Sequence, residues 1–220
     1  MVARAVSSRQ FLRVHQRIGK LVFLLTLLLL TTAVAQTWQE ATDGVVTVRT
    51  ASNADRAYLP EVFAIIQQAR RDLRGWGLAL EPLTIVIHPA LTNYQAATGM
   101  PWYVAAVADT HARRLDMQRV RVLAERGSLT ATLRHELFHL AQPAGLERYV
   151  AEGLAMHFAH ETPQAPPLLG QLEHLNTVLA QPANQHELQQ AMARAHAEVA
   201  ARLRREPAAA LLRRHALHTP

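Results

Sequence analysis

The sequence predicts an α+β fold, in which a small mixed or antiparallel sheet packs on a pair of helices and a helical C-terminal segment follows. Runs rich in β-branched residues in the first half predict the strands. A run over 129–142 without Gly or Pro, followed after a short turn by a second helical run over 146–160, predicts the helix pair. Beyond residue 163 the chain is rich in Leu, Ala, Gln, Glu and Arg, which favour helices.

The first half supplies the predicted sheet and one long amphipathic helix. The predicted elements are strands at Gly44–Thr50 and Leu83–His88, a helix at Arg56–Arg74, and a short helical or turn segment at Asn93–Thr98. Two further strand candidates follow, Val104–Ala108 and Arg119–Leu123. They could pair as a hairpin across Asp109–Arg114, with His111 in the solvated loop.

The helix pair has recognisable start and stop signals. Ser128 or Thr130 can cap the first helix, and Pro143 and Gly145 break the chain after it. Three leucines of this helix are spaced to pack inward: Leu133, Leu137 and Leu140. The short turn between the two runs predicts that they pack as antiparallel neighbours.

The tail is expected to be helical. A Pro-rich linker at 163–167 leads to a Leu-rich helix at 168–180, and Pro182 breaks it. A helix over 185–205 and a last one after Pro207 complete the chain. Residues 36–162 are therefore interpreted as the core, and 163–220 as a helical segment of the same domain.

Residues 1–35 are predicted to be a secretory signal peptide. Five basic residues and no acidic one precede an apolar run over 21–30, and the small-x-small pattern Ala33-Val34-Ala35 predicts cleavage before Gln36. The alternative is an uncleaved membrane anchor, although a transmembrane helix needs about 20 apolar residues. Export to the periplasm or the medium is the expectation.

The leader accounts for the basic charge of the chain. There are 23 Lys and Arg against 17 Asp and Glu, and removing the five in the leader leaves 18 against 17. This balance excludes a nucleic-acid-binding surface that depends on a basic excess. There is no Cys, so neither disulfides nor a lipid anchor on cysteine can form.

The chemistry is concentrated in the sequence His135-Glu136-Leu137-Phe138-His139. On a helix, residues four apart lie on the same face one turn apart, so His135 and His139 can direct two imidazoles to one point. Glu136 can reach a water held at that point. Two imidazoles with a carboxylate suit zinc and leave a fourth position for water, whose pKa the metal lowers.

Glu152 is the predicted third ligand. It lies 13 positions after His139, and an antiparallel helix pair brings the two residues to nearly the same level. Glu147 lies too close to the turn and Glu161 beyond the expected helix end. Gly153 also permits another helix to approach closely.

Thr132–Leu140 and the aromatic-x-x-E-G-L-A pattern of Tyr149–Ala155 resemble the gluzincin zinc metallopeptidases, and the peptidase MA-like group among them. The likeness covers about residues 129–160. The resemblance implies a zincin-type active-site helix pair and a peptide or protein substrate. It also implies zinc binding by the two histidines and Glu152, and a general-base role for Glu136.

The resemblance extends less closely to three other features. It implies that Val104–Ala108 is an edge strand to which an extended peptide can add, although an interior strand fits its apolar composition as well. It implies that the helical tail covers the lower side of the cleft, the alternative being a peripheral or partner-binding bundle. Tyr149 stands where many relatives have Trp, and His157 where relatives often have Tyr.

Tyr149 and His157 are candidate donors to the oxyanion that forms when water attacks a carbonyl. The alternative is that Tyr149 packs the helix pair and that His157 is an ordinary, partly buried histidine. The scattered His174, His186 and His196 form no pair at helical ligand spacing.

These patterns together predict an exported, single-domain, zinc-dependent peptidase. The first alternative is an exported zinc-binding protein without turnover that acts by binding a partner. The second is a membrane-tethered helical interaction protein in which H-E-x-x-H occurs by chance.

Overall fold

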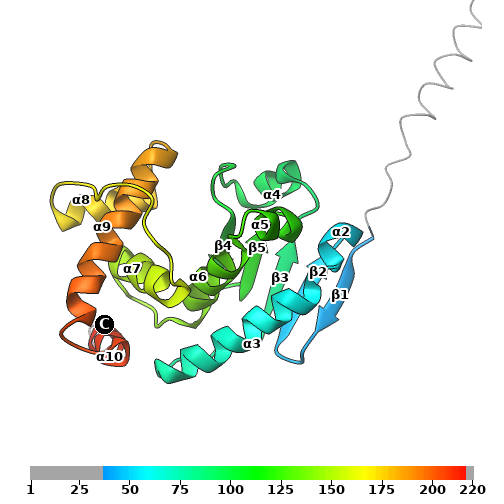
Figure 1. The fold of residues 1–220 in the computed structure, drawn as a ribbon, viewed down its shortest axis with the longest axis horizontal. Helices are drawn as coiled ribbons and strands as arrows, with labels where there is room; N and C mark the ends of the chain where they lie inside the picture. The colour runs from blue at the N-terminus through cyan, green and yellow to red at the C-terminus, as the bar shows by residue number, and fades with distance from the viewer. Residues whose placement is uncertain (1–36, 217–220) are drawn as a thin grey trace, which may run out of the picture. The chain divides into compact units, whose positions relative to one another are not determined.

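In the computed structural model, which describes residues 37–216, five strands form one mixed sheet in the order β1-β2-β3-β5-β4 (Figure 1). The outer pairs β1–β2 and β4–β5 are antiparallel, and the inner pairs β2–β3 and β3–β5 are parallel. The strands are β1 (Gln39–Thr42), β2 (Val46–Thr50), β3 (Leu83–Ile87), β4 (Ala106–Asp109) and β5 (Arg114–Met117). An α+β architecture with a mixed sheet is thereby confirmed.

The two faces of the sheet differ in polarity because side chains alternate along each strand. One row across the sheet contains Val48, Ile85, Leu115 and Ala108, and the first three are fully buried. The row beside it, on the opposite face, contains Arg49, Val86, Asp116 and Val107. The apolar face is therefore the one that can carry the main core.

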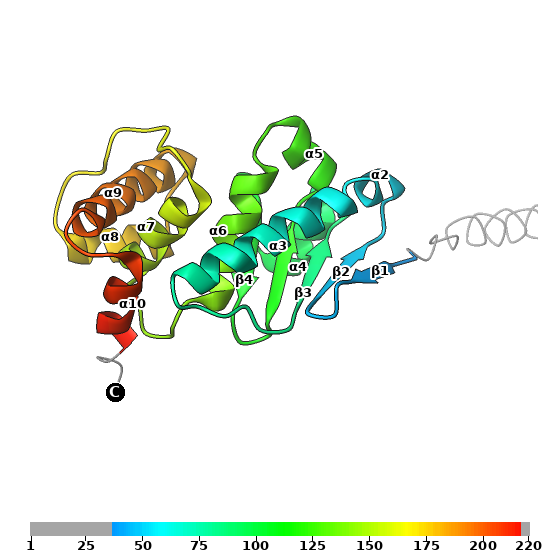
Figure 2. The ribbon, with the colours of Figure 1, turned by 60° about the horizontal axis from the view of Figure 1, so that its bottom comes forward.

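Helices α3 (Leu59–Gly75) and α6 (Leu129–Ala141) pack together over this apolar face (Figure 2). The buried residues of α3 are spaced three or four apart and belong to the same core as the strands: Val62, Ile65, Ile66, Ala69 and Leu73. Helix α4 (Leu91–Thr98) lies on the other face, where the ring of Tyr94 meets that of His88 edge-on at 5.8 Å. Thus α6 is held between the sheet and the remaining helices.

The helices of the second half form a group of their own beside α6 (Figures 1 and 2). They are α7 (Arg148–Ala159), α8 (Leu172–Ala180), α9 (Gln185–Leu203) and α10 (Ala208–Ala216). Helix α7 packs on both α6 and α9. A Cβ added at Gly153 would lie 2.5 Å from the backbone oxygen of Ala195, so the glycine after Glu152 permits a very close approach of α9.

Most predicted elements are found with ends shifted by a few residues. The predicted strands 44–50 and 83–88 correspond to β2 and β3, and the helix predicted over 56–74 begins at Leu59. The predicted helix pair corresponds to α6 and α7, the second of which begins at Arg148. Ser128 is the N-cap residue of α6, but its hydroxyl donates to the Leu123 carbonyl instead of capping.

The strand predicted at Arg119–Leu123 is wrong, because this segment begins helix α5 (Val120–Glu125). Val120 and Leu123 are both buried, and their spacing of three suits one face of a helix. The partner of β4 is instead β5, which begins inside the stretch predicted to be the hairpin loop. A hairpin is therefore present, but its second strand is Arg114–Met117 and not the predicted Arg119–Leu123.

Two short elements have no counterpart in the prediction. Strand β1 has the sequence Gln-Glu-Ala-Thr and is recognisable only by its pairing with β2. Helix α2 (Asn53–Arg56) is a single turn, capped by Ser52 through the N–H of Asp55. Elements of four residues carry too little periodicity to be identified from sequence.

The predicted leader over 1–35 lies outside the described residues. Within the described residues, the chain from Trp38 to residue 216 forms one compact unit. Within residues 37–216, none of the helices has the length and apolar character that a membrane crossing requires.

Candidate metal centre

Helix α6 presents His135 and His139 on one side. The two residues are one turn apart on a 13-residue helix without Gly or Pro, and their ring centroids are 4.9 Å apart. Between them, Leu137 and Phe138 are fully buried in the core. Burial of the intervening residues fixes the rotation of the helix and so directs both imidazoles towards α7.

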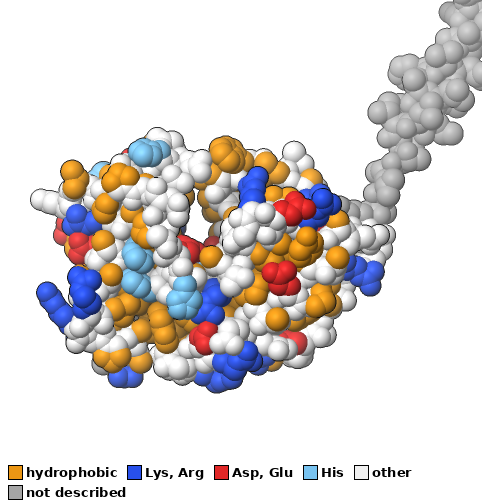
Figure 3. Space-filling model, viewed as in Figure 1, with side chains coloured by type: hydrophobic (Ala, Val, Ile, Leu, Met, Phe, Trp, Pro, Cys, Tyr) orange, Lys and Arg blue, Asp and Glu red, His pale blue; other side chains and the backbone are white. Residues whose placement is uncertain are grey.

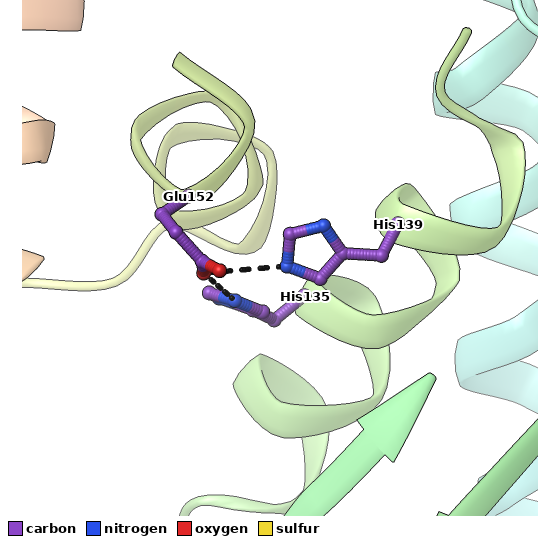
Figure 4. A group of neighbouring side chains, drawn as sticks. All are labelled: His135, His139 and Glu152. Carbon is purple, nitrogen blue, oxygen red and sulfur yellow. Dashed lines mark hydrogen bonds and ion pairs between the residues drawn. The ribbon is translucent and has the colours of Figure 1, made fainter. Parts of the chain in front are cut away.

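Glu152 on α7 meets both imidazoles (Figure 4). Its Oε2 lies 3.3 Å from Nε2 of His135 and 3.4 Å from Nε2 of His139. The three side chains each offer one ligand atom within 4.8 Å of the others, and they are the one such group that could hold a metal among the described residues. The predicted ligands are thus brought together.

The other ring nitrogen of each histidine faces an oxygen acceptor. Nδ1 of His135 lies 3.1 Å from Oε1 of Glu161, and Nδ1 of His139 lies 3.3 Å from Oε1 of Gln142. Both acceptors favour a proton on Nδ1, which leaves the lone pair of Nε2 directed at the common point. An oxygen acceptor behind a histidine ligand is the usual arrangement at protein metal sites.

Glu161 reaches this position because of the way α7 ends. His160 adopts a left-handed conformation with φ of 56°, and the N–H of Glu161 donates to the Met156 carbonyl at 2.9 Å. The turn brings Glu161 back along the helix to His135. The position of Glu161 beyond the expected helix end excluded it as a metal ligand but did not predict this contact with His135, because a non-glycine residue at the turn gives no recognisable pattern.

Burial and charge act against each other at the three ligands and their neighbour. Burial alone would raise the pKa of Glu152, but His139 and His135 outweigh it and hold that pKa well below its usual value. Burial likewise opposes protonation of His135, yet its hydrogen bonds to Glu152 and Glu161 raise its pKa well above the ordinary range. The site therefore combines one strongly acidic carboxyl, Glu152, with one strongly basic imidazole, His135.

Glu136 has a different environment from Glu152. Burial raises its pKa, and the neighbouring histidines together with a hydrogen bond from the backbone of Ala108 reduce that rise without cancelling it. A carboxyl with a raised pKa is a stronger base once ionised. The pKa of Glu136 is thus raised and that of Glu152 is lowered, a difference that suits a proton acceptor and a metal ligand respectively.

Arg134, the residue before the motif, fastens the helix pair. Its Nε and Nη2 donate to the Phe158 carbonyl at 3.0 and 2.7 Å, and its Nη1 contacts Asp72 on α3 at 2.7 Å. The side chain is buried against the ring of Phe158, with the guanidinium 4.4 Å from the ring centroid. One buried arginine therefore ties α3, α6 and α7 together around the ligands.

The ligands lie in a cleft of about 730 Å³. Figure 3 shows the hollow between the sheet and the helices of the second half, with acidic side chains inside it. One wall is the stretch 103–108, and α6 and α7 contribute the floor. The tail supplies apolar residues to the opposite side: Leu179, Ala180, Pro182, Leu188 and Met192. Helices α8 and α9 thus contribute to the lining of the cleft.

Strand β4 is terminal in the sheet, so the predicted edge position of 104–108 is confirmed for the part that forms the strand. The Gln118 N–H donates to the Ala105 carbonyl, and bonded pairs alternate along an antiparallel ladder. The register then directs the backbone groups of Ala106 and Ala108 away from β5 and towards the cleft.

Tyr149 and His157 do not line the cleft. The Tyr149 side chain is buried, and its hydroxyl accepts a hydrogen bond from Arg202 on α9. His157 stacks on His196 of α9, with ring centroids 4.2 Å apart, and its Nε2 lies 3.3 Å from the His196 carbonyl oxygen. Both contacts correspond to the packing alternative rather than to an oxyanion donor.

The three candidate ligands, the acceptors behind them and the cleft are therefore defined by the contacts of the chain itself. The donor set of two imidazole nitrogens and one carboxylate oxygen fits zinc. No protein-family model, curated protein or solved structure was found to match the chain.

Proposed function

We propose that the protein is a zinc-dependent peptidase with a gluzincin-type arrangement. The observation that carries the proposal is the convergence of Nε2 of His135, Nε2 of His139 and Oε2 of Glu152, with 3.3 and 3.4 Å between the carboxylate oxygen and the nitrogens. Three protein ligands leave one coordination position open, which distinguishes catalytic zinc sites from structural ones. When bound, zinc would polarise a carbonyl group and lower the pKa of a water molecule.

Glu136 is the proposed general base. It is adjacent to His135 in the chain and lines the same cleft, and burial raises its pKa towards the range in which proton transfer at neutral pH is efficient. Its carboxylate takes a proton from the attacking water. The same carboxyl then gives the proton to the amine that leaves when the peptide bond breaks.

The edge of β4 is the proposed substrate-binding surface. The outward backbone groups of Ala106 and the carbonyl of Ala108 can pair with an extended peptide, which would then run along the cleft beside Glu136. Backbone pairing of this kind does not depend on the sequence of the peptide. It therefore supports a peptide or protein substrate over a small metabolite.

The hydrogen bonds of Arg134 also support the proposal, because they hold the helices in fixed positions. Catalysis requires ligands and base to be held in position before substrate arrives. Arg134 connects α6 to both α7 and α3 through buried or half-buried contacts, so the helices that carry the proposed ligands are fixed to each other and to α3. The predicted leader, in addition, leads us to propose that the protein acts after export.

The test combines metal analysis with cleavage of a peptide library by the purified protein. We expect one zinc per chain in the parent and in Glu136→Gln, cleavage by the parent, and loss of nearly all cleavage in Glu136→Gln. Glu152→Ala should lose zinc, and Glu173→Gln, an exposed change on α8, serves as the matched control. Cleavage by Glu136→Gln at the parental rate would exclude Glu136 as the base. Stoichiometric zinc without cleavage would favour the alternative, a binding protein without turnover.

A further inference from the structure

Arg148 is the one arginine or lysine among the described residues that line the cleft. Three carboxylates line the same space, those of Glu136, Glu152 and Glu161. A guanidinium group stays charged at any physiological pH. The cleft therefore has an acidic interior with a permanent positive charge at one point.

The geometry of α7 brings Arg148 close to the ligands. It is the first residue of the helix and lies one turn before Glu152, so both side chains project from the same side. Its Nε is 3.9 Å from Oε1 of Glu152, which is an ion pair but too long for a hydrogen bond. The side chain is 52% exposed, and within residues 37–216 we find no other hydrogen bond or ion pair to it.

The guanidinium therefore has hydrogen-bond donors that Glu152 does not take up. Its planar fork matches the two oxygens of a carboxylate and forms two parallel hydrogen bonds with it. Elsewhere in the cleft, Glu136 and Glu161, the two carboxylates that are not proposed zinc ligands, would repel a negatively charged group beside them. Attraction at Arg148 and repulsion at these two carboxylates would favour one position for a substrate carboxylate.

We infer that the cleft takes peptides with a carboxylate close to the bond that is cut, and that Arg148 binds this carboxylate. The inference rests on the proposed peptidase function and adds a substrate class to it. The carboxylate can be the C-terminus of the peptide or an Asp or Glu side chain, because both present the same two oxygens. The apolar residues Leu179, Leu188 and Met192, on the same cleft, suit apolar side chains in the rest of such a peptide.

The experiment compares matched peptides with the parent protein, Arg148→Gln and a control variant. The peptides are an acetylated Ala/Leu pentapeptide with a free C-terminus, its C-terminal amide, and the amide with Asp or Glu substituted at each position in turn. The control is Arg121→Gln, because Arg121 is a half-exposed arginine in an i,i+4 ion pair outside the cleft.

We expect the parent to cleave at least one class of carboxylate-bearing peptide with about tenfold higher kcat/KM than the plain amide, the worth of a charge-assisted hydrogen bond that is partly solvated. Arg148→Gln should lose this preference, so that its kcat/KM is the same for the acid and the amide peptides. Arg121→Gln should behave as the parent. Preference for the free C-terminus alone, or for Asp and Glu alone, identifies which carboxylate is bound.

Calorimetric binding of the same peptides to zinc-loaded Glu136→Gln, with and without Arg148→Gln, gives a readout that is independent of turnover. We expect Kd for the carboxylate-bearing peptide to rise about tenfold on loss of Arg148, with zinc affinity unchanged. Equal affinity of the parent site for acid and amide peptides would overturn the inference. So would an equal loss for both peptides together with weaker zinc binding, because Arg148 would then support Glu152 and not the substrate.

Failure of the proposed function is distinguishable from failure of this inference. A protein that neither holds zinc nor cleaves any of the peptides contradicts the peptidase proposal itself. A protein that holds zinc and cleaves acid and amide peptides at equal rates contradicts only the role of Arg148.

Discussion

The two sides of helix α7 carry different kinds of residue: one side lines the cleft, and the other packs against α9. The side towards the cleft carries Arg148 and Glu152, whose polar atoms face space that a ligand can enter. The side towards α9 carries Tyr149, Gly153 and His157, each in close contact with that helix or accommodating it. Residues that are neighbours in the sequence therefore lie on opposite sides of one helix. We call the side with Arg148 and Glu152 the chemical side, and the side that contacts α9 the packing side.

The comparison shows why spacing matters more than residue type. Arg148 lies four positions before Glu152, about 40° away around the helix, since each residue turns the chain by about 100°. His157 lies five positions after Glu152, about 140° away, and so cannot share its direction. An oxyanion donor on α7 would have to project from the helix in nearly the same direction as Glu152. The five-residue spacing of His157 from Glu152 excludes this already from the sequence.

The largest expected effect comes from filling the packing side at Gly153. In Gly153→Ala the new Cβ would lie 2.5 Å from both the Ala195 backbone oxygen and Cγ2 of Val199, so α7 and α9 must separate. We expect a loss of about 3 kcal/mol or more in the free energy of unfolding, measured by urea denaturation, because overpacking a core against backbone is poorly relieved.

Gly75→Ala is the matched control. Gly75 is also helical, and nothing lies within 4 Å of a Cβ added there. We expect no loss, and a gain of up to about 0.5–1 kcal/mol, from this change. If the two variants were equally stable, the close contact of α7 with α9 would not exist in solution.

The second-largest effect concerns Glu161, which lies behind His135 and is expected to orient its ring. Glu161→Gln keeps the shape of the acceptor behind His135 but removes its charge. We expect zinc affinity to fall by about 10–100-fold, as is usual for residues that orient metal ligands, with little change in stability. Competition with a chelating dye measures this, and Glu173→Gln provides the comparison. Unchanged zinc affinity would mean that Glu161 does not orient His135.

The third effect tests the assignment of Tyr149 to packing. Tyr149→Phe loses only the hydroxyl that accepts from Arg202. We expect about 1 kcal/mol less stability and unchanged zinc content and kcat, because the group lies outside the cleft. A hundredfold fall in kcat with unaltered stability would instead return Tyr149 to the catalytic machinery.

The smallest effect concerns pH and the packing side. Burial lowers the pKa of His157, with a further contribution from His196, and burial also lowers the pKa of His196. The unfolded chain therefore binds protons first as the pH falls below about 6.5, and the folded state loses stability there. His157→Gln should make the loss between pH 7.5 and 5.5 shallower, as measured by urea denaturation at both values. A slope as steep as that of the parent would contradict this reading.

The sequence predicted the convergence of His135, His139 and Glu152 better than it predicted their surroundings. Helix periodicity is local, so the spacing of His135 and His139 and the turn before α7 were enough to bring Glu152 to them. The strand at Arg119–Leu123 was misjudged because alternating Arg and Val favour a strand, whereas burial of Val120 and Leu123 decides for a helix. The roles of Arg134 and Arg148 depend on contacts between helices, which no local pattern contains.

The position of β4 has a consequence for behaviour at high concentration. An unpaired strand at the end of a sheet is normally a liability, since another copy can extend the sheet through it and begin an aggregate. Here the outward groups of Ala106 and Ala108 open into a recess walled by α6, α7 and the tail helices. A second copy could extend the sheet only by inserting a strand into this recess, so the walls restrict sheet extension through β4.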